Sequence, residues 1–171
     1  MDYYSILSTL LFTVFGDEDS PNTLKYDDKY VERKLHYTSD PKVVTNEEWK
    51  NVLSTLQYKV MRENSTERAG TSPFLHLHYP DHRGFFICSA CDHPLFEMSA
   101  KYTSGSGWPS FFEPMNNDSV GYRAIRDTDA KEVHCKRCGS HLGHVFNDGP
   151  LPTGKRYCIN GVTLFYNMTL Y

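Results

Sequence analysis

The sequence predicts a predominantly β domain preceded by a short helical segment. After residue 70, glycine, proline, asparagine and aspartate separate short aromatic and β-branched runs, a pattern typical of short strands joined by tight turns. The clearest runs are residues 84–88, 131–134, 156–159 and 162–167. The 171-residue length and the 14% aromatic content fit one folded domain with a substantial core.

Two capping boxes predict the helical segment. Thr45 with Glu48, and Ser54 with Gln57, each have the S/T-x-x-E/Q spacing in which two side chains satisfy unpaired backbone amides at a helix start. Because the second box interrupts the first helix, we expect two short helices that end near Arg62. The i, i+3, i+4, i+7 spacing predicts one buried face, formed by Trp49, Val52, Leu53 and Leu56.

We expect three segments: an N-terminal apolar segment at 1–25, a helical extension at 26–69, and the β domain at 70–171. An apolar run at 6–15 has the length of a signal-peptide core, but no Lys or Arg precedes it, so a signal peptide and a buried or frayed helix both stay open. The location therefore stays open between the cytoplasm and the secretory pathway. Possible glycan acceptors, relevant only to a secreted chain, are Asn64, Asn117 and Asn167.

Charge, hydropathy and cysteine usage exclude several classes of protein. A net charge of −3 gives no basic footprint for nucleic acid. No apolar run approaches the length of a transmembrane helix. The five cysteines are an odd number and are not spread as in a disulfide-stapled extracellular domain.

Four of the cysteines predict a structural zinc site. Cys88 and Cys91 form one C-x-x-C pair, Cys135 and Cys138 form another, and 43 residues lie between the pairs. Each pair directs two thiolates to one side of a turn, and four thiolates leave no open coordination position. The metal would then join two distant hairpins. The alternatives are a redox C-x-x-C motif, unrelated buried cysteines, or His141 as a competing ligand.

Cys158 is the remaining thiol. Arg156, two residues away on the same face of an extended strand, is expected to lower the pKa of this thiol and favour the reactive thiolate. His141 and His144 can serve as acid, base or water-positioning groups. The alternative is that Cys158 is a small buried apolar residue and that the histidines lie at the surface or in ordinary hydrogen bonds.

Trp108 lies in a glycine-rich loop at 104–111 and is followed by proline. A flat apolar ring that faces a pocket suits recognition of a small apolar group such as a methyl. The alternative is a core tryptophan on a turn.

From residue 45 to residue 165 the chain resembles the methionine sulfoxide reductase B family. The matching motifs, in order, are CxxC at 88–91, PLF at 94–96, SGSGWPSF at 104–111, EVxCxxC at 132–138, HLGHVF at 141–146, DGP at 148–150, PTG at 152–154 and RYCxN at 156–160. The resemblance implies two antiparallel sheets after a helical segment, and one structural zinc ion opposite the active site.

The resemblance also implies reduction of methionine-(R)-sulfoxide in proteins by a monomeric enzyme. Cys158 is the implied nucleophile, which attacks the sulfoxide sulfur and leaves methionine and a cysteine sulfenic acid. His144 is the implied main acid for the departing oxygen, and His141 assists through water. Supporting roles fall to Asn160, which orients the substrate and histidines, Arg156, which supports the thiolate, and Trp108, which holds the ε-methyl.

Two positions depart from the family pattern. Ser106 stands where many members have a resolving cysteine, so an external thiol such as thioredoxin, glutathione or a small dithiol is expected to reduce the sulfenic acid. Gly161 stands where the family usually has serine, and it is expected to loosen the loop behind the nucleophile.

A rival interpretation is a non-enzymatic zinc-stabilised β platform that binds a ligand or partner through aromatic residues. It accounts for the four paired cysteines and for Trp108. It gives no reason for the combination of Cys158, His141, His144 and Asn160.

Overall fold

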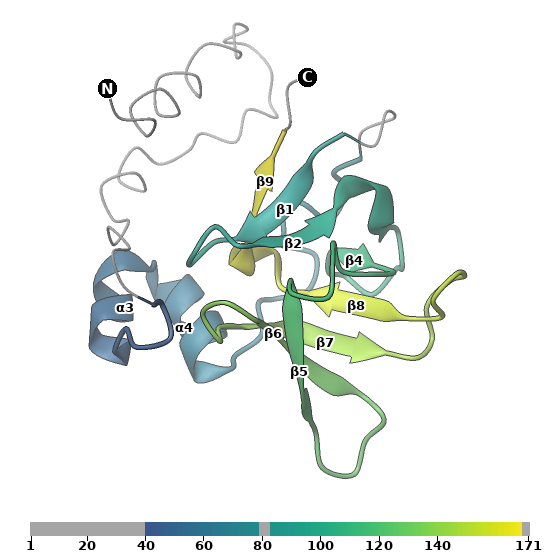
Figure 1. Ribbon diagram of the computed structural model, residues 1–171. Helices are drawn as coiled ribbons and strands as arrows, with labels where there is room; N and C mark the ends of the chain where they lie inside the picture. Colours follow the sequence, from purple (N-terminus) through teal and green to yellow (C-terminus); the bar gives the residue numbers. More distant parts are fainter. Residues whose placement is uncertain (1–39, 79–82, 169–171) are drawn as a thin grey trace, which may run out of the picture. The chain divides into compact units, whose positions relative to one another are not determined.

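The computed structural model describes residues 40–78 and 83–168 of the chain (Figure 1). The expected apolar segment at 1–25 and the first part of the helical extension lie outside the described residues. Within them, two short helices precede two antiparallel sheets, as the sequence predicts.

The helices α3 (Asn46–Val52) and α4 (Thr55–Glu63) begin at the two capping boxes. At the second box, the Gln57 N–H donates to Ser54 Oγ at 3.2 Å, and the Ser54 N–H donates to Gln57 Oε1 at 3.0 Å. The predicted break into two helices is therefore confirmed.

The predicted buried face is correct at Trp49 and Leu53, only partly correct at Val52, which is half-buried against the core, and wrong at Leu56. Trp49 and Leu53 are buried, whereas Leu56 is 51% exposed. The reason is that the cap at Ser54 restarts the helix, so the spacing counted from Trp49 does not continue into α4. The residues of α4 that are buried instead are Gln57, Tyr58, Val60 and Met61.

The first sheet has the strand order β2-β1-β9 and the second has the order β3-β4-β8-β7-β6-β5, with every pairing antiparallel. The first comprises β1 (Phe85–Cys88), β2 (Pro94–Glu97) and β9 (Leu164–Asn167). The second comprises β3 (Lys101–Tyr102), β4 (Ser110–Phe111), β5 (Val120–Ala124), β6 (Lys131–Cys135), β7 (His141–Phe146) and β8 (Arg156–Ile159). Two 3-10 turns, η1 (Met98–Ala100) and η2 (Gly161–Thr163), occur between strands, so the strand expected at 162–167 begins only at Leu164.

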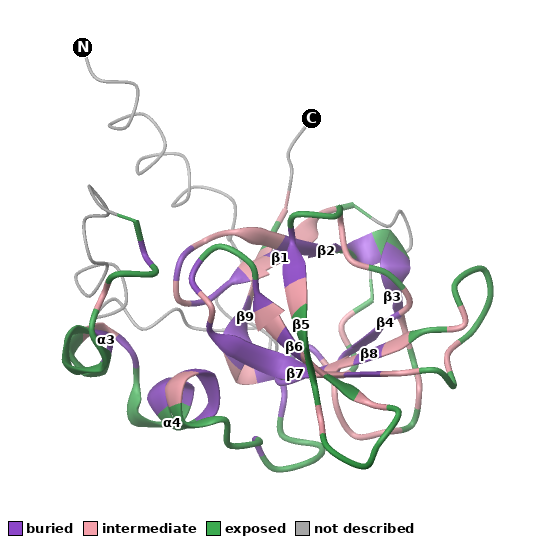
Figure 2. Cartoon of the chain, turned by 60° about the horizontal axis from the view of Figure 1, so that its bottom comes forward, coloured by how far each residue is buried: buried purple, intermediate pink, exposed green. Residues whose placement is uncertain are grey.

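Aromatic side chains pack the two sheets together. Phe111 of β4 stacks on Phe96 of β2 with ring centroids 4.4 Å apart, and it meets Phe86 of β1 edge to face at 5.1 Å. Figure 2 shows buried residues on most strands and on one side of α4, while exposed residues gather in the connecting loops, on α3 and along β5. Since Tyr157 and Ile159 of β8 face this core, the alternation of the strand turns Arg156 and Cys158 to the other face.

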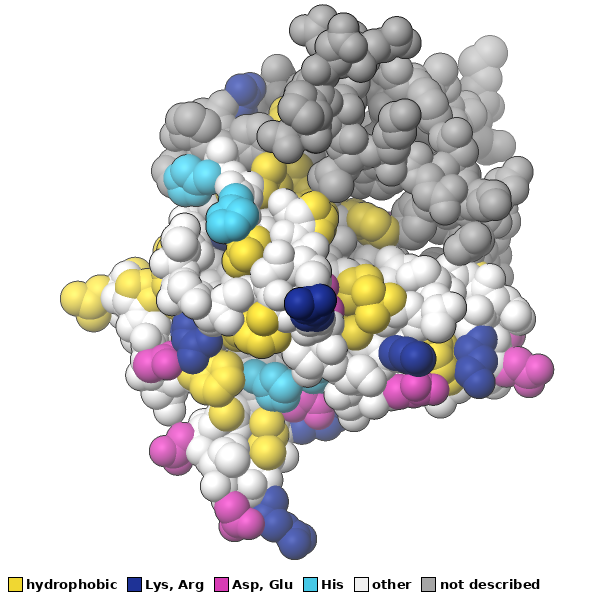
Figure 3. All heavy atoms as spheres, turned by 180° about the vertical axis from the view of Figure 1, so that it is seen from behind, with side chains coloured by type: hydrophobic (Ala, Val, Ile, Leu, Met, Phe, Trp, Pro, Cys, Tyr) yellow, Lys and Arg dark blue, Asp and Glu magenta, His cyan; other side chains and the backbone are white. Residues whose placement is uncertain are grey.

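Within the described residues, no helix is long and apolar enough to cross a membrane. On the face shown in Figure 3, acidic and basic side chains are interspersed, as the small net charge leads one to expect.

Candidate active site

The register of the six-stranded sheet places Cys158 beside one of the candidate histidines. Cys158 on β8 pairs with His144 on β7 and with Ser110 on β4. His144 pairs in turn with Glu132 on β6. Because directly opposed residues of antiparallel strands share a face, these four residues form one row across the sheet.

A β-bulge brings His141 next to His144. Residues three apart on a regular strand point to opposite faces. Here the pairing between β6 and β7 skips Leu142, the extra residue that shifts the phase of the strand. The two imidazole rings consequently meet edge to face, with centroids 5.3 Å apart.

Glu132 orients His141. Its Oε1 lies 3.1 Å from His141 Nδ1 and accepts from Arg123 Nη1 at 2.9 Å. His141 is 2% exposed, and no described residue gives its Nε2 a hydrogen bond. A carboxylate at Nδ1 favours the tautomer protonated there, which leaves Nε2 as an acceptor.

The surroundings of His144 favour its neutral imidazole form. Burial, and then the nearby His141, lower the pKa of His144, while Glu132 opposes them. A neutral ring beside a thiol can accept its proton.

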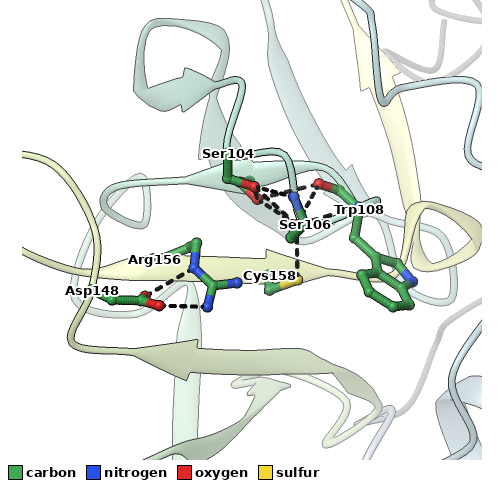
Figure 4. Close-up of polar contacts among 7 residues, drawn as sticks. Ser104, Ser106, Trp108, Asp148, Arg156 and Cys158 are labelled. Atoms are coloured by element: carbon green, nitrogen blue, oxygen red, sulfur yellow. Dashed lines mark hydrogen bonds and ion pairs between the residues drawn. The ribbon is translucent and has the colours of Figure 1, made fainter. Parts of the chain in front are cut away.

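A cluster of serine hydroxyls lies beside the sulfur of Cys158 (Figure 4). Ser106 Oγ is 3.6 Å from Cys158 Sγ. Ser104 Oγ lies 2.9 Å from Ser106 Oγ and 2.7 Å from Ser110 Oγ. A hydroxyl at this position can donate to a thiolate as it forms.

Arg156 lies next to Cys158, but its charge is already compensated (Figure 4). Its Nε and Nη2 donate to the two carboxylate oxygens of Asp148 at 2.9 and 2.8 Å, and its guanidinium stacks 4.3 Å over Phe146. Burial raises the pKa of the Cys158 thiol, although Ser106 and Arg156 act to lower it. The expected depressed thiol pKa is therefore wrong for the free protein, because desolvation of the thiolate outweighs a cation that is paired with Asp148.

Trp108 lies on the other side of Cys158 from Arg156 (Figure 4). The ring is half-buried, and its Nε1 donates to the main-chain oxygen of Glu67 at 3.2 Å. This bond fixes the N–H edge of the ring against the segment that contains Glu67.

Asn160 is buried behind the nucleophile at 3% exposure. Its Nδ2 donates to the Leu142 carbonyl, and its Oδ1 accepts from the Glu67 N–H, both at 2.9 Å. The amide therefore holds the bulge that carries His141, and both of its polar atoms are engaged by backbone groups.

An open cavity of about 530 Å³ adjoins the site on the Arg156 side. Its lining includes Tyr102, Ser104, Ser106, Asp148, Pro150 and Arg156. Two of its lining residues, Ser106 and Arg156, neighbour Cys158.

Gly161 does not loosen the loop behind the nucleophile. Its N–H donates to Glu67 Oε1 at 2.6 Å, and a Cβ at this position would lie 1.9 Å from Ser72 Oγ. Glycine serves close packing here, so the expectation of a looser loop is wrong.

Three acidic residues of the site, Glu132, Asp148 and Glu67, have no predicted role in the sequence. Glu132 and Asp148 belong to the motifs that carry the family resemblance. Their position in these motifs is the sequence feature that could have marked them as site residues. Glu67 follows α4 in a stretch without periodicity, and only the folded chain brings it to the site.

The four paired cysteines form a buried cluster away from this row. Cys88 and Cys91 lie in the β1–β2 hairpin, Cys135 and Cys138 in the β6–β7 hairpin, and all four sulfurs lie within 4.8 Å of one another. The closest sulfur pairs are 3.6 and 3.8 Å apart. A tetrahedral ion with Zn–S bonds of about 2.3 Å needs sulfurs about 3.8 Å apart. The donor set therefore fits zinc, and His141 is turned to Glu132 instead.

The fold and the site together define a two-sheet β protein that carries one thiol beside two imidazoles and, separately, a four-cysteine metal-type cluster. The SelR domain family matches residues 53–168. A peptide methionine sulfoxide reductase MsrB of Methanosarcina barkeri is 50% identical over 125 residues, which cover 70% of this chain and 84% of that protein. The MsrB proteins of Methanosarcina mazei and Thiobacillus denitrificans are each 48% identical, covering 70% and 76% of this chain and 85% and 96% of theirs.

The chain therefore belongs to the MsrB family. A solved structure of the Mis18 'Yippee-like' domain covers 52% of this chain and 99% of its own, with a TM-score of 0.43 and 19% identity. That overlap is too weak to support an argument.

Proposed function

We propose that this chain is a peptide-methionine (R)-S-oxide reductase that repairs oxidised methionine in proteins. The observation that carries the proposal is the row of Cys158 and His144 beside Trp108 in a chain of the MsrB family. The catalytic unit is assigned to residues 70–171, with residues 26–69 as a helical extension.

Cys158 attacks the sulfoxide sulfur as its thiol proton passes to the neutral His144. The imidazolium then donates a proton to the sulfoxide oxygen, so one histidine serves as base and then as acid. The attack forms a bond between Cys158 Sγ and the substrate sulfur. Transfer of the protonated oxygen to Cys158 Sγ breaks this bond and the original sulfur–oxygen bond, and leaves methionine and Cys158 sulfenic acid; the methionine sulfur is reduced by two electrons and the cysteine sulfur is oxidised by two.

The neighbouring residues support this step. His141, held by Glu132 with Nε2 as an acceptor, assists through water. Trp108 contacts the ε-methyl, and Asn160 orients the histidines through the Leu142 carbonyl. Arg156 and the Ser106 hydroxyl favour the thiolate once substrate has arrived.

An external thiol recycles the enzyme. Of the five cysteines of the chain, four form the cluster, and Ser106 occupies the position next to Cys158 where a resolving cysteine would stand. Two equivalents of thiol, supplied by thioredoxin, glutathione or a small dithiol, convert the sulfenic acid to the Cys158 thiol and water and are themselves oxidised to a disulfide. The cavity beside Arg156 gives this reductant access.

Cys88, Cys91, Cys135 and Cys138 hold one structural zinc ion in this proposal. A bound zinc ion cross-links the β1–β2 and β6–β7 hairpins and takes no part in the reaction.

The test is turnover of separated R and S methionine-sulfoxide peptides with dithiothreitol. We expect reduction of the R epimer alone, because a site that fixes the methyl, the oxygen and the chain is chiral. Cys158→Ser should lower kcat by at least about a thousandfold while melting is unchanged, since the nucleophile is lost and the core is not. Comparable turnover of the S epimer, or by the serine variant, would overturn the assignment. A folded, metal-loaded protein without turnover would favour the β platform.

A further inference from the structure

Glu67 connects the two sides of the candidate site through its side chain and its main chain. It lies in the segment between α4 and β1 and is 5% exposed. Its Oε1 accepts the Gly161 N–H at 2.6 Å, and its Oε2 accepts the Val162 N–H at 3.0 Å. The carboxylate therefore fixes η2, which begins directly after Asn160.

The main chain of Glu67 makes two further bonds to predicted site residues. Its N–H donates to Asn160 Oδ1 at 2.9 Å. Its carbonyl accepts from Trp108 Nε1 at 3.2 Å. One residue thus binds both the amide behind the nucleophile and the ring proposed to contact the substrate methyl.

Residues 66–72, here called the strap, approach the site loops at van der Waals distance. The Gly70 N–H donates to the Gly107 carbonyl at 2.8 Å, and a Cβ on Gly107 would lie 3.0 Å from Ala69 Cβ. At the other end a Cβ on Gly161 would collide with Ser72. Glycines on both sides therefore allow the strap to lie against the Trp108 loop and η2.

A buried carboxylate is costly unless its oxygens are hydrogen-bonded. Backbone N–H groups supply these bonds, and among the described residues no ion pair is formed by Glu67. The position of the strap consequently depends on the match between two carboxylate oxygens and two amides of η2.

We propose that Glu67 is a positioning residue for the reductase reaction, fixing the Trp108 ring and the Asn160 amide relative to Cys158. The inference rests on the proposed function. None of the four hydrogen bonds of Glu67 described above reaches the Cys158 sulfur, so its effect passes through the residues that it holds.

The first test compares Glu67→Gln with Glu63→Gln. Glutamine keeps the shape of Glu67 but points an NH₂ group at one of the two amides, so the strap shifts. We expect KM for the R-sulfoxide peptide to rise about tenfold with kcat within about threefold, because binding geometry is lost and the nucleophile is retained. Glu63 is exposed at the end of α4, and its variant should match the wild type.

The second test observes the Trp108 ring directly. The chain has two tryptophans, so its nitrogen–proton NMR spectrum should contain two indole signals, assigned with Trp108→Phe. Glu67→Gln should move the Trp108 signal and accelerate its exchange with solvent, while the signal of buried Trp49 stays in place. A role in stability alone would not move one indole selectively.

A double-mutant cycle links the two tests. Trp108→Phe removes the N–H that reaches the Glu67 carbonyl, so Glu67→Gln should raise KM less in the phenylalanine background than in the wild type. Independent, additive effects would contradict the proposal.

A Glu67→Gln protein with unchanged KM and unchanged indole signals would overturn the positioning role, whatever its melting temperature. If that variant does not fold, the same measurements are made on Glu67→Asp, which keeps the carboxylate charge but has a side chain shorter by one methylene group. Absence of wild-type turnover would instead overturn the proposed function, and the indole signals would then decide the positioning role separately.

Discussion

The four-cysteine cluster and the Cys158 site use the same side chain in opposite ways. In the cluster, two hairpin turns each supply two sulfurs, and all four are buried within 4.8 Å of one another. At the site, one sulfur is only partly buried and lies among hydroxyl, imidazole and guanidinium groups from several strands. The cluster is assembled from short local motifs, whereas the reactive site is assembled by strand register.

This difference also separates stability from reactivity. The cluster joins a hairpin of each sheet and therefore constrains the fold. Cys158 lies on the sheet face opposite the aromatic core and can change its chemistry without changing the packing. The two regions should consequently respond to different perturbations.

Metal removal should have the largest effect. Structural zinc contributes about 10–16 kcal/mol of apparent binding free energy in small peptides, and part of this should appear as folding free energy here. We expect one zinc ion per chain and a large drop in melting temperature after chelation, measured by metal analysis and circular dichroism. Cys135→Ser should reproduce the drop, and Cys158→Ser is the matched control that should not. A chelated protein that melts like the loaded one would contradict the structural role of the cluster.

The pH dependence of alkylation and of kcat/KM should show that Cys158 is protonated in the free protein, unlike a cysteine whose thiolate is permanently charged. Burial disfavours the thiolate, so the rate of iodoacetamide alkylation of Cys158 in the free protein should rise roughly tenfold per pH unit through neutral pH and level off only above the raised pKa of this thiol. In turnover, kcat/KM should rise with pH through the lowered pKa of His144, below about 6.5, because the neutral ring must accept the thiol proton. It should fall above the raised pKa of Cys158, where that proton is already lost.

Alkylation that reaches its plateau below pH 7 would show that the thiolate forms before substrate binds. The charge of Arg156 would then stabilise the thiolate in spite of the ion pair with Asp148, and our account of the raised thiol pKa would be wrong. His144→Asn should remove the acidic limb of the kcat/KM profile, and an unchanged limb would assign it to another group.

Ser106→Cys should replace direct reduction of the Cys158 sulfenic acid by an external thiol with formation of an internal disulfide. We expect this change to alter turnover by about a few-fold. Wild-type protein treated with substrate but no reductant should carry one added oxygen, trapped by dimedone, and no internal disulfide. The Ser106→Cys protein should instead lose two hydrogens, which is the mass change of an internal disulfide. The serine oxygen lies only 3.6 Å from Cys158 Sγ, so a small movement brings a sulfur at this position to the disulfide bond length of about 2 Å. Loss of two hydrogens by the wild type would mean that a cluster cysteine resolves Cys158.

Local sequence signals predicted the local structure well. Both capping boxes formed, and the strands expected at 84–88, 131–134 and 156–159 are present within one residue. The prediction for Leu56 failed because a periodicity was continued across a second N-cap. The strand expected at 162–167 starts late because Gly161–Thr163 form η2, where the N–H groups of Gly161 and Val162 donate to the Glu67 carboxylate.

The sequence by itself determined the two helices, the β class, the paired cysteines, the single remaining thiol and the family resemblance. Each of these depends on residues close together in the chain or on motifs in a fixed order. Only the tertiary structure decided that a bulge at Leu142 brings two histidines together, that Asp148 compensates Arg156, and that burial raises the pKa of Cys158. It also decided that Glu67 reaches Gly161, 94 residues away. The physical reason is that desolvation and hydrogen-bond partners depend on which segments meet in space, and strand register sets those meetings.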